Sequence, residues 1–141
     1  MNTEEIEQAL RRCGQFDGVF ATDDLPDKPR LLVVNTDPAH RPGRHWVCMY
    51  VGDDRRGEYF DSLGQPPTAD FESYLNRHCF FWTFNKRQLQ SVISSFCGHY
   101  CIYYCTLRCR GLDLVKIVRG FTTDTALNDA LVHAFACRSR V

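Results

Sequence analysis

The sequence predicts an α+β domain in which a small, mostly antiparallel sheet packs against a central helix. Short apolar and aromatic runs alternate with segments of helical spacing, in the order helix, strands, helix, strand, helices. The longest helical segment, residues 97–110, is apolar over most of its circumference and should therefore be surrounded by other elements. With 141 residues, 44% of them hydrophobic, the chain suffices for one core, so we expect a single domain over residues 1–141.

The first half of the chain is expected to form one helix and three strands. Asn2 can cap the helix with Glu5 three residues later, and Gly14 ends it. Residues 16–26 carry glycine, aspartate and proline in a pattern typical of a loop. The strands are expected at 31–34, 45–51 and 57–61, with a polar loop at 39–44 and a hairpin turn at 52–56.

The second half is expected to be mainly helical. A helix at 69–79 precedes a short aromatic strand at 80–84, and residues 86–90 are a candidate extension of a neighbouring strand. The central helix at 97–110 ends at Gly111. Two more helices are expected at 113–119 and 124–137, the second capped by Thr122 or Thr123.

The eight cysteines are interpreted as thiols rather than as a disulfide framework. No apolar N-terminal segment resembles a signal peptide, and no run approaches the length of a transmembrane helix. We therefore expect an intracellular protein that is not secreted, makes no membrane contact and keeps its cysteines reduced. Cys101, Cys105 and Cys109 follow Cys97 at intervals of four on one helix, where four ligands cannot surround a tetrahedral metal. We expect these three to be small buried residues and expect no metal site.

Four residues, His45, Asp61, Gln90 and Cys97, together supply the groups that a cysteine hydrolase needs. Cys97 stands where a polar stretch turns into the central helix, and a helix N-terminus lowers the pKa of a thiol. His45 opens a strand directly after a loop, where its side chain can reach a cleft. Gln90 offers a neutral amide that can donate to an oxyanion, and Gln88 competes for that role.

Asp61 ends the strand that should pair with the His45 strand. If residue 51 lies opposite 57, residue 47 lies opposite 61, which places His45 one diagonal step from Asp61 on the same face. A carboxylate there can hold the imidazole tautomer and stabilise the imidazolium. Taken singly, each of these residues also has a structural explanation, as a core cysteine, a strand-end histidine, a turn aspartate or an edge glutamine. His99 remains a reserve candidate for the base.

Three segments, residues 43–46, 59–64 and 90–101, resemble the adenovirus maturation protease (adenain) family of adenoviruses, related viruses and virus-like DNA transposons. The order His, acidic residue, Gln, Cys is that family's order, and the Ulp-type proteases share it. The resemblance covers about residues 15–110 and implies a cysteine endopeptidase with the adenain-like, papain-related fold. By position, Cys97 would be the nucleophile, His45 the general base and acid, and Asp61 the group that orients His45. Gln90 and the Cys97 backbone amide would form the oxyanion hole.

The same resemblance implies a substrate and partners. Such enzymes would cut viral or transposon capsid precursor proteins at small-residue, Gly-containing sites during particle maturation. Trp46 would line the substrate cleft, and Gly98 would let a substrate backbone come close. The chemistry requires no cofactor. DNA and a disulfide-linked peptide stimulate the adenovirus member, so either activator stays open here. We expect a monomer in the host nucleus or cytoplasm, with packaging into the virion also open.

Three alternatives remain at this point. A Ulp-type protease that removes a ubiquitin-like modifier shares the catalytic set but needs a broad surface for a folded partner. A structural metal protein could use His45 and Cys48, although residues three apart on a strand point to opposite faces. A non-catalytic DNA-binding module is disfavoured by the formal net charge of zero, from 17 basic and 17 acidic residues.

Overall fold

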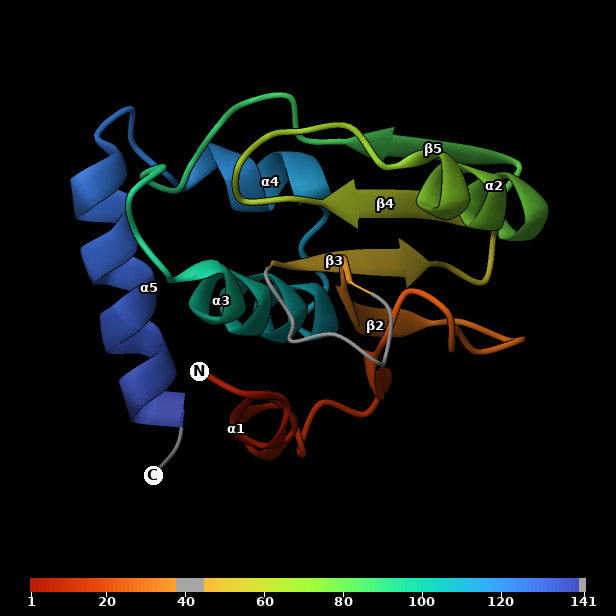
Figure 1. Ribbon diagram of the computed structural model, residues 1–141, viewed down its shortest axis with the longest axis horizontal. Coiled ribbons are helices and arrows are strands. Elements are labelled where there is room, and N and C mark those ends of the chain that lie inside the picture. The colour runs from red at the N-terminus through yellow and green to blue at the C-terminus, as the bar shows by residue number, and fades with distance from the viewer. Residues whose placement is uncertain (38–44, 140–141) are drawn as a thin grey trace.

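The computed structural model describes residues 1–37 and 45–139, so the loop expected at 39–44 lies outside the described part of the chain. Within that part the chain forms five strands and five helices (Figure 1). The strands are β1 (Phe16–Phe20), β2 (Leu31–Asn35), β3 (Trp46–Val51), β4 (Arg56–Phe60) and β5 (Phe81–Phe84). The helices are α1 (Thr3–Ala9), α2 (Ala69–His78), α3 (Cys97–Cys109), α4 (Leu114–Arg119) and α5 (Thr125–Ser139).

The five strands form one mixed sheet in the order β1-β2-β3-β4-β5. The two inner pairings are antiparallel, and the two outer ones, β1 with β2 and β4 with β5, are parallel. The hairpin register is the expected one, because Val51 lies opposite Gly57. The antiparallel part of the expectation therefore describes the centre of the sheet, and the edges add parallel pairings.

β1 was expected to be a loop and is instead an edge strand. Apolar and polar residues hardly alternate along it, and it includes Asp17 and Gly18, which are uncommon in strands. Its sequence therefore gives little indication of a strand. The segment becomes a strand because it pairs with β2, whose first four residues are buried. Gly18 has φ +137° at the point where the register shifts, a backbone conformation that favours glycine.

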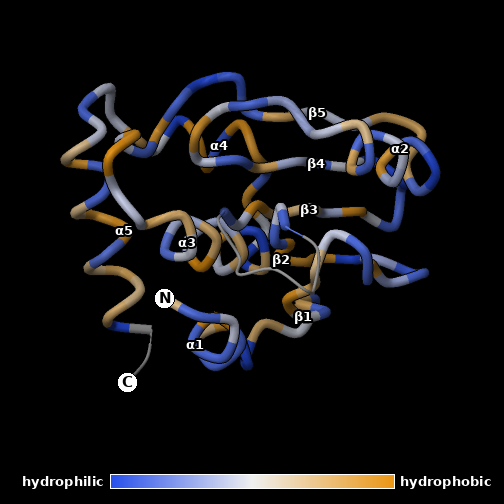
Figure 2. Tube along the Cα trace, viewed as in Figure 1, coloured by the Kyte–Doolittle hydropathy of each residue, from blue (hydrophilic) through white to orange (hydrophobic). Residues whose placement is uncertain are grey.

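The sheet is covered on both faces, in three layers. α2 packs on one face against Leu32, Val34 and Met49. On the other face, α3 and α1 contact the strands, and α4 and α5 pack against α3 (Figure 1). Successive residues of β2 alternate between these two cores, as the two-residue period of a strand requires. α1 is hydrophilic over much of its length (Figure 2), in keeping with Ile6 being its only buried residue.

Two helix and strand expectations change in detail. Residues 86–90 form no strand; instead the backbone N–H groups of Leu89 and Gln90 both donate to the Ser62 carbonyl, at 2.8 and 3.0 Å. The cap of α5 is Asp124 rather than Thr122 or Thr123, because the Asp124 carboxylate accepts from two backbone N–H groups of the first turn.

The expectation of reduced, buried thiols holds for some cysteines and not for others. Cys101 and Cys105 are 1% and 0% exposed, as expected. Cys109, however, is only partly buried and forms a disulfide with Cys13, with Cα atoms 6.0 Å apart. The two cysteines are 96 residues apart and meet because α1 packs on the same core as α3.

No helix within the described residues is long and apolar enough to cross a membrane.

Candidate active site

Residues from five separate segments meet around a cavity of about 400 Å³ at the start of α3. They come from the N-terminus, the start of β3, the turn after β4, the 90–95 segment and α3. The lining residues are Met1, His45, Trp46, Leu63, Gln90, Val92, Ser94, Ser95 and Cys97. Three of the four residues singled out in the sequence, His45, Gln90 and Cys97, thus face one space, and Asp61 lies directly behind His45.

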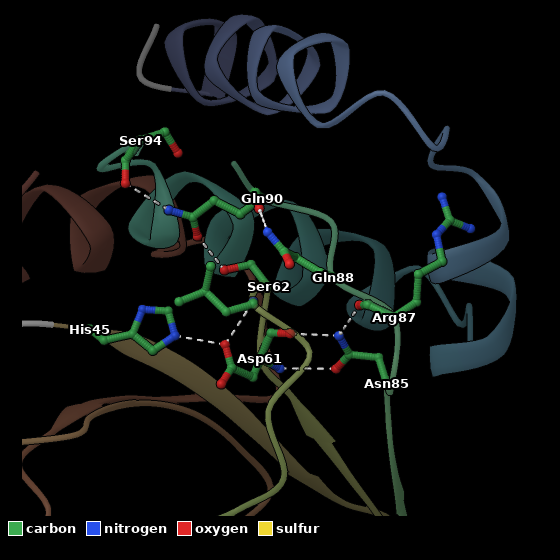
Figure 3. Close-up of polar contacts among 9 residues, drawn as sticks. His45, Asp61, Ser62, Asn85, Arg87, Gln88, Gln90 and Ser94 are labelled. Atoms are coloured by element: carbon green, nitrogen blue, oxygen red, sulfur yellow. Dashed lines mark hydrogen bonds and ion pairs between the residues drawn. The ribbon is translucent and has the colours of Figure 1, made fainter. Parts of the chain in front are cut away.

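His45 and Asp61 form a close, largely buried pair. Nε2 of His45 lies 2.7 Å from Oδ1 of Asp61 (Figure 3). The side chains are 18% and 6% exposed, so little water competes with this contact. The same Asp61 oxygen accepts from the backbone N–H of Leu63 at 2.9 Å. Asp61 is therefore both the start of a turn and the partner of His45.

The backbone of Asp61 is held in turn by Asn85, which the sequence did not single out. The Asp61 N–H donates to Asn85 Oδ1 at 3.0 Å, and Asn85 Nδ2 donates back to the Asp61 carbonyl at 2.5 Å (Figure 3). Asn85 is 5% exposed, so both bonds are shielded from water. The end of β4 is thereby fixed to the end of β5.

His45 also hydrogen-bonds Cys97, and this contact changes the pKa of both groups. Burial alone would lower the pKa of His45, but hydrogen bonds to Asp61 and Cys97 and their negative charges raise it to about 9. Burial would raise the pKa of Cys97, yet the His45 hydrogen bond, the backbone N–H groups of Trp46 and Gly98 and the charge of His45 lower it. Both shifts favour an imidazolium beside a thiolate.

Cys97 is the first residue of α3, and its side chain is 8% exposed. The preceding residue, Phe96, makes no side-chain capping hydrogen bond, so no cap side chain competes for the N–H groups of the first turn. α3 is 13 residues long, and Cys97 lies at the positive end of its dipole. This is the position in which a helix promotes a thiolate.

Gln90 lines the cavity with its side-chain amide held at both ends. Its Oε1 accepts from the Ser62 hydroxyl at 2.5 Å, and its Nε2 donates to the Ser94 carbonyl at 3.1 Å (Figure 3). Gln88, the competing glutamine, uses its own Nε2 to donate to the Gln90 carbonyl at 2.9 Å. Gln90 therefore faces the cavity, and Gln88 supports its backbone.

Trp46 and Gly98 pack against each other beside Cys97. A Cβ atom added to Gly98 would come within 3.1 Å of the Trp46 ring and of the Met1 sulfur. The tight space at Gly98 is thus filled by this chain's own side chains, a different reason for glycine from the substrate approach expected there. The indole Nε1 of Trp46 is buried and has no hydrogen-bond partner among the described residues.

Within the described residues, the reserve base and one of the two candidate metal ligands, Cys48, do not line the cavity at Cys97. His99, the reserve base, is buried beside the rings of Phe96 and His133 rather than at Cys97. Cys48 lies in the core with its sulfur 3.8 Å from that of Cys105. In the described part of the chain no group of three or more His, Cys, Asp or Glu side chains is arranged to hold a metal ion.

A larger cavity of about 590 Å³ lies near the β3–β4 turn and the start of α4. Its central carboxylate, Glu58, is already occupied by Arg108, the Tyr104 hydroxyl and the Leu114 backbone N–H. No thiol or histidine is among the residues that line it. We therefore assign the chemistry to the smaller cavity at Cys97.

Ser62, Asn85 and the helix α5 contribute to the site without having been predicted. Asp61 was predicted to orient His45, but nothing was predicted for Ser62, whose hydroxyl donates to Gln90. The contribution of α5 had no local signal, because Asp129 is 38 residues away from its partner Ser91.

Comparison with known proteins supports the fold and the resemblance. No protein-family model matches the chain. It is 29% identical over 119 residues to a cysteine protease of African swine fever virus, covering 73% of this chain and 42% of that protein. It is also 29% identical over 115 residues to the protease of bovine adenovirus 4, covering 70% of this chain and 57% of that protein. The chain thus spans about half the length of these relatives.

The structure is similar to that of the African swine fever virus protease, with a TM-score of 0.67, 19% identity, and coverage of 94% of this chain and 66% of that one. The central domain of an uncharacterized Legionella pneumophila protein gives a TM-score of 0.59 at 13% identity, covering 99% and 95% of the two chains. ChlaDub1 from Chlamydia trachomatis also gives 0.59, at 15% identity and coverage of 80% and 60%. These structures confirm the predicted α+β fold class, and the sequence matches confirm the resemblance. On sequence and fold together, the chain is similar to the adenain-like cysteine proteases of viruses.

Proposed function

We propose that this chain is a cysteine endopeptidase with Cys97 as nucleophile. The observation that carries the proposal is the His45 ring, whose Nε2 lies 2.7 Å from Asp61 and which also hydrogen-bonds Cys97. A thiol, a base and an orienting carboxylate in this sequence of contacts are what acyl transfer to sulfur requires. The names of the two viral relatives, a cysteine protease and a protease, support the same reaction.

The reaction proceeds through a thioester. The Cys97 thiolate attacks the carbonyl carbon of the scissile peptide, and the tetrahedral oxyanion receives hydrogen bonds from Gln90 and the Cys97 backbone N–H. His45 is protonated at the nitrogen facing Cys97, and it gives that proton to the leaving amine as the C–N bond breaks. His45 then takes a proton from water, which attacks the thioester, releases the acid product and restores the thiolate. Asp61 holds the ring and stabilises its charged form throughout.

The proposed substrates are viral or transposon capsid precursor proteins, cut at sites that contain glycine. The cavity is about 400 Å³, and bulky side chains, including Trp46, Leu63 and Val92, line it, which favours small substrate residues. The chemistry uses only side chains and backbone of this chain, with DNA or a peptide as candidate activators. We place the active enzyme as a monomer in the host nucleus or cytoplasm, or in the particle.

The test is labelling and cleavage by the purified chain compared with Cys97→Ala and His45→Ala. A thiol-directed peptide electrophile ending in glycine should label Cys97 alone, located by mass spectrometry, and both substitutions should abolish rapid labelling and peptide cleavage. Cys97→Ala should keep the circular dichroism spectrum, because a thiol-to-methyl change at a helix start removes little packing. Cys137→Ala serves as the control, because Cys137 is an exposed free cysteine that does not line the cavity.

Cleavage that persists in Cys97→Ala rejects the proposed nucleophile. If labelling is slow and its rate is the same in the wild-type chain and both variants, the site is not assembled in the isolated chain. Repeating the labelling with added DNA then tests for an activator. A fluorogenic ubiquitin-like modifier substrate, run in parallel, distinguishes the endopeptidase from a Ulp-type enzyme.

A further inference from the structure

We propose that Ser62 is a positioning residue for the reaction, whose hydroxyl fixes the side-chain amide of Gln90 in the orientation that serves the oxyanion. The inference rests on the proposed protease function and concerns a residue that touches neither the thiol nor the imidazole. Ser62 acts through Gln90.

The contact between the two side chains is short and closed to water. The Ser62 hydroxyl donates to Gln90 Oε1 at 2.5 Å. Ser62 is 1% and Gln90 3% exposed, so water is poorly placed to replace this hydrogen bond. A buried amide oxygen that lost its donor would favour any rotation that found another one.

Two contacts together fix the amide plane. The Ser94 carbonyl can only accept, so it selects the orientation in which Gln90 Nε2, rather than Oε1, faces it, at 3.1 Å. The Ser62 hydroxyl then sets where Oε1 lies. An amide nitrogen carries two N–H groups, so one bond to Ser94 leaves the second N–H available for an oxyanion in the cavity that Gln90 shares with Cys97.

Ser62 also joins the two halves of the proposed catalytic machinery. Its carbonyl accepts from the backbone N–H groups of Leu89 and Gln90. Its chain neighbour, Asp61, holds His45. Two consecutive residues thus support the base on one side and the oxyanion donor on the other (Figure 3).

The backbone contacts make the inference testable by a single substitution. Ser62→Ala removes the hydroxyl and keeps the carbonyl that binds Leu89 and Gln90, so the turn should still form. Donors that are oriented before the reaction stabilise a transition state best. We expect kcat to fall about tenfold in Ser62→Ala with KM within about twofold, less than the ~100-fold fall expected for Gln90→Ala, which loses the donor itself.

The matched control is Tyr104→Phe, which also removes a buried hydroxyl from a short hydrogen bond, to Glu58 at 2.6 Å. It should leave kcat per folded molecule unchanged. Thermal melts of both variants confirm that the molecules assayed are folded.

A double-mutant cycle distinguishes positioning from a general structural effect. If Ser62 acts through Gln90, adding Ser62→Ala to Gln90→Ala should cause no further loss of kcat. If Ser62→Ala lowers kcat tenfold in the Gln90→Ala background as well, the inference is overturned. An unchanged kcat in Ser62→Ala overturns it too.

A second readout does not depend on cleavage. The side-chain amide NMR signals of Gln90, assigned by their absence in Gln90→Ala, should shift in Ser62→Ala and not in Tyr104→Phe. Unchanged signals overturn the positioning role. If the wild-type chain cleaves no better than Cys97→Ala, the proposed function fails, while these signals still decide whether Ser62 orients Gln90.

Discussion

Asp61 Oδ1 accepts two hydrogen bonds, one from the His45 ring and one from the Leu63 backbone N–H. The second bond fixes the carboxylate in the turn, so that the first is made without further ordering of the side chain. Because the pair is largely buried, the charge of Asp61 acts on the imidazole with little screening by water. At the scale of single residues, this carboxylate connects the turn geometry to the protonation state of the base.

We predict a bell-shaped dependence of kcat/KM on pH, with an alkaline limb near pH 9. The pKa of His45 is raised to about 9, so the imidazolium persists up to that pH and rate is lost as pH rises through it. The acid limb belongs to Cys97, whose pKa is lowered, so rate is lost as the thiolate gains a proton. Asp61→Asn removes the charge that raises the pKa of His45 and should move the alkaline limb to lower pH.

Asp61→Asn should also reduce kcat more than it raises KM, because the residue acts on the base rather than on substrate. Asp54→Asn is the control, since Asp54 pairs with Arg56 on the surface. An alkaline limb that stays in place in Asp61→Asn contradicts the assignment of that limb to the His45–Asp61 pair.

The sequence could predict the His45–Asp61 pair because a hairpin is local. Once Val51 lies opposite Gly57, simple counting brings residues 45 and 61 together. The Ser62–Gln90 and Asp61–Asn85 contacts follow from no such count. They join segments 28 and 24 residues apart whose spacing depends on a turn, a helix and a parallel strand pairing.

At the scale of elements, α5 supports the segment that carries Gln90. Asn128 Nδ2 donates to the Leu89 carbonyl at 3.1 Å, and Asp129 Oδ1 accepts from the Ser91 backbone N–H at 3.4 Å. The same Asp129 oxygen accepts from the Tyr100 hydroxyl of α3 at 2.7 Å. Burial and the nearby Asp129 raise the pKa of Tyr100, so this hydroxyl stays protonated and donates. α5 thus holds both chain neighbours of Gln90.

We predict that Asp129→Ala lowers the free energy of unfolding by about 2 kcal/mol, because it removes a charged acceptor and leaves buried donors weakly paired. Urea unfolding followed by circular dichroism measures the change. Tyr100→Phe should lower the free energy of unfolding less when it is added to Asp129→Ala than when it is made alone, since the two side chains share one hydrogen bond. Fully additive effects would mean that the Tyr100–Asp129 bond contributes nothing. Glu72→Ala, on the exposed side of α2, is the control.

The same scale explains which elements were predictable. α2, α3 and β2 carry strong periodicity or continuous apolar runs, and their observed limits match expectation closely. β1 has neither, and it is a strand because a buried neighbour offers it backbone partners. The cap of α5 was assigned to the wrong residue because Thr122, Thr123 and Asp124 are all good cap formers and only the fold selects among them.

At the scale of the whole molecule, two cores lie on opposite faces of one sheet, and the site lies beside the larger one, against which Met1 and Trp46 of the cavity pack. Residues of α1, α3, α4 and α5 form the larger core, and α2 closes the smaller one. The Cys13–Cys109 disulfide joins the segment after α1 to the far end of α3. It closes a loop across 96 residues, which the sequence could not reveal because eight cysteines allow many pairings.

We predict that this disulfide stabilises the protein by about 2–4 kcal/mol, because a crosslink that closes a long loop lowers the conformational entropy of the unfolded chain. Reductant should lower the urea midpoint of the wild-type chain and leave that of Cys13→Ser unchanged. Cys137→Ser, which removes an exposed free cysteine, should behave as wild type. If reductant leaves the urea midpoint of the wild-type chain unchanged, Cys13 and Cys109 are thiols in the purified protein.

The acidity of Cys97 comes from groups that are scattered along the polypeptide. Of the three that lower its pKa, the His45 ring and the Trp46 N–H lie some fifty residues earlier, and only the Gly98 N–H is a neighbour. A nascent or misfolded chain therefore carries an ordinary thiol at this position. In the newly made polypeptide the proposed nucleophile is therefore unactivated. β3 must pack against α3 before Cys97 can react with any protein, including other copies of this chain that are still folding.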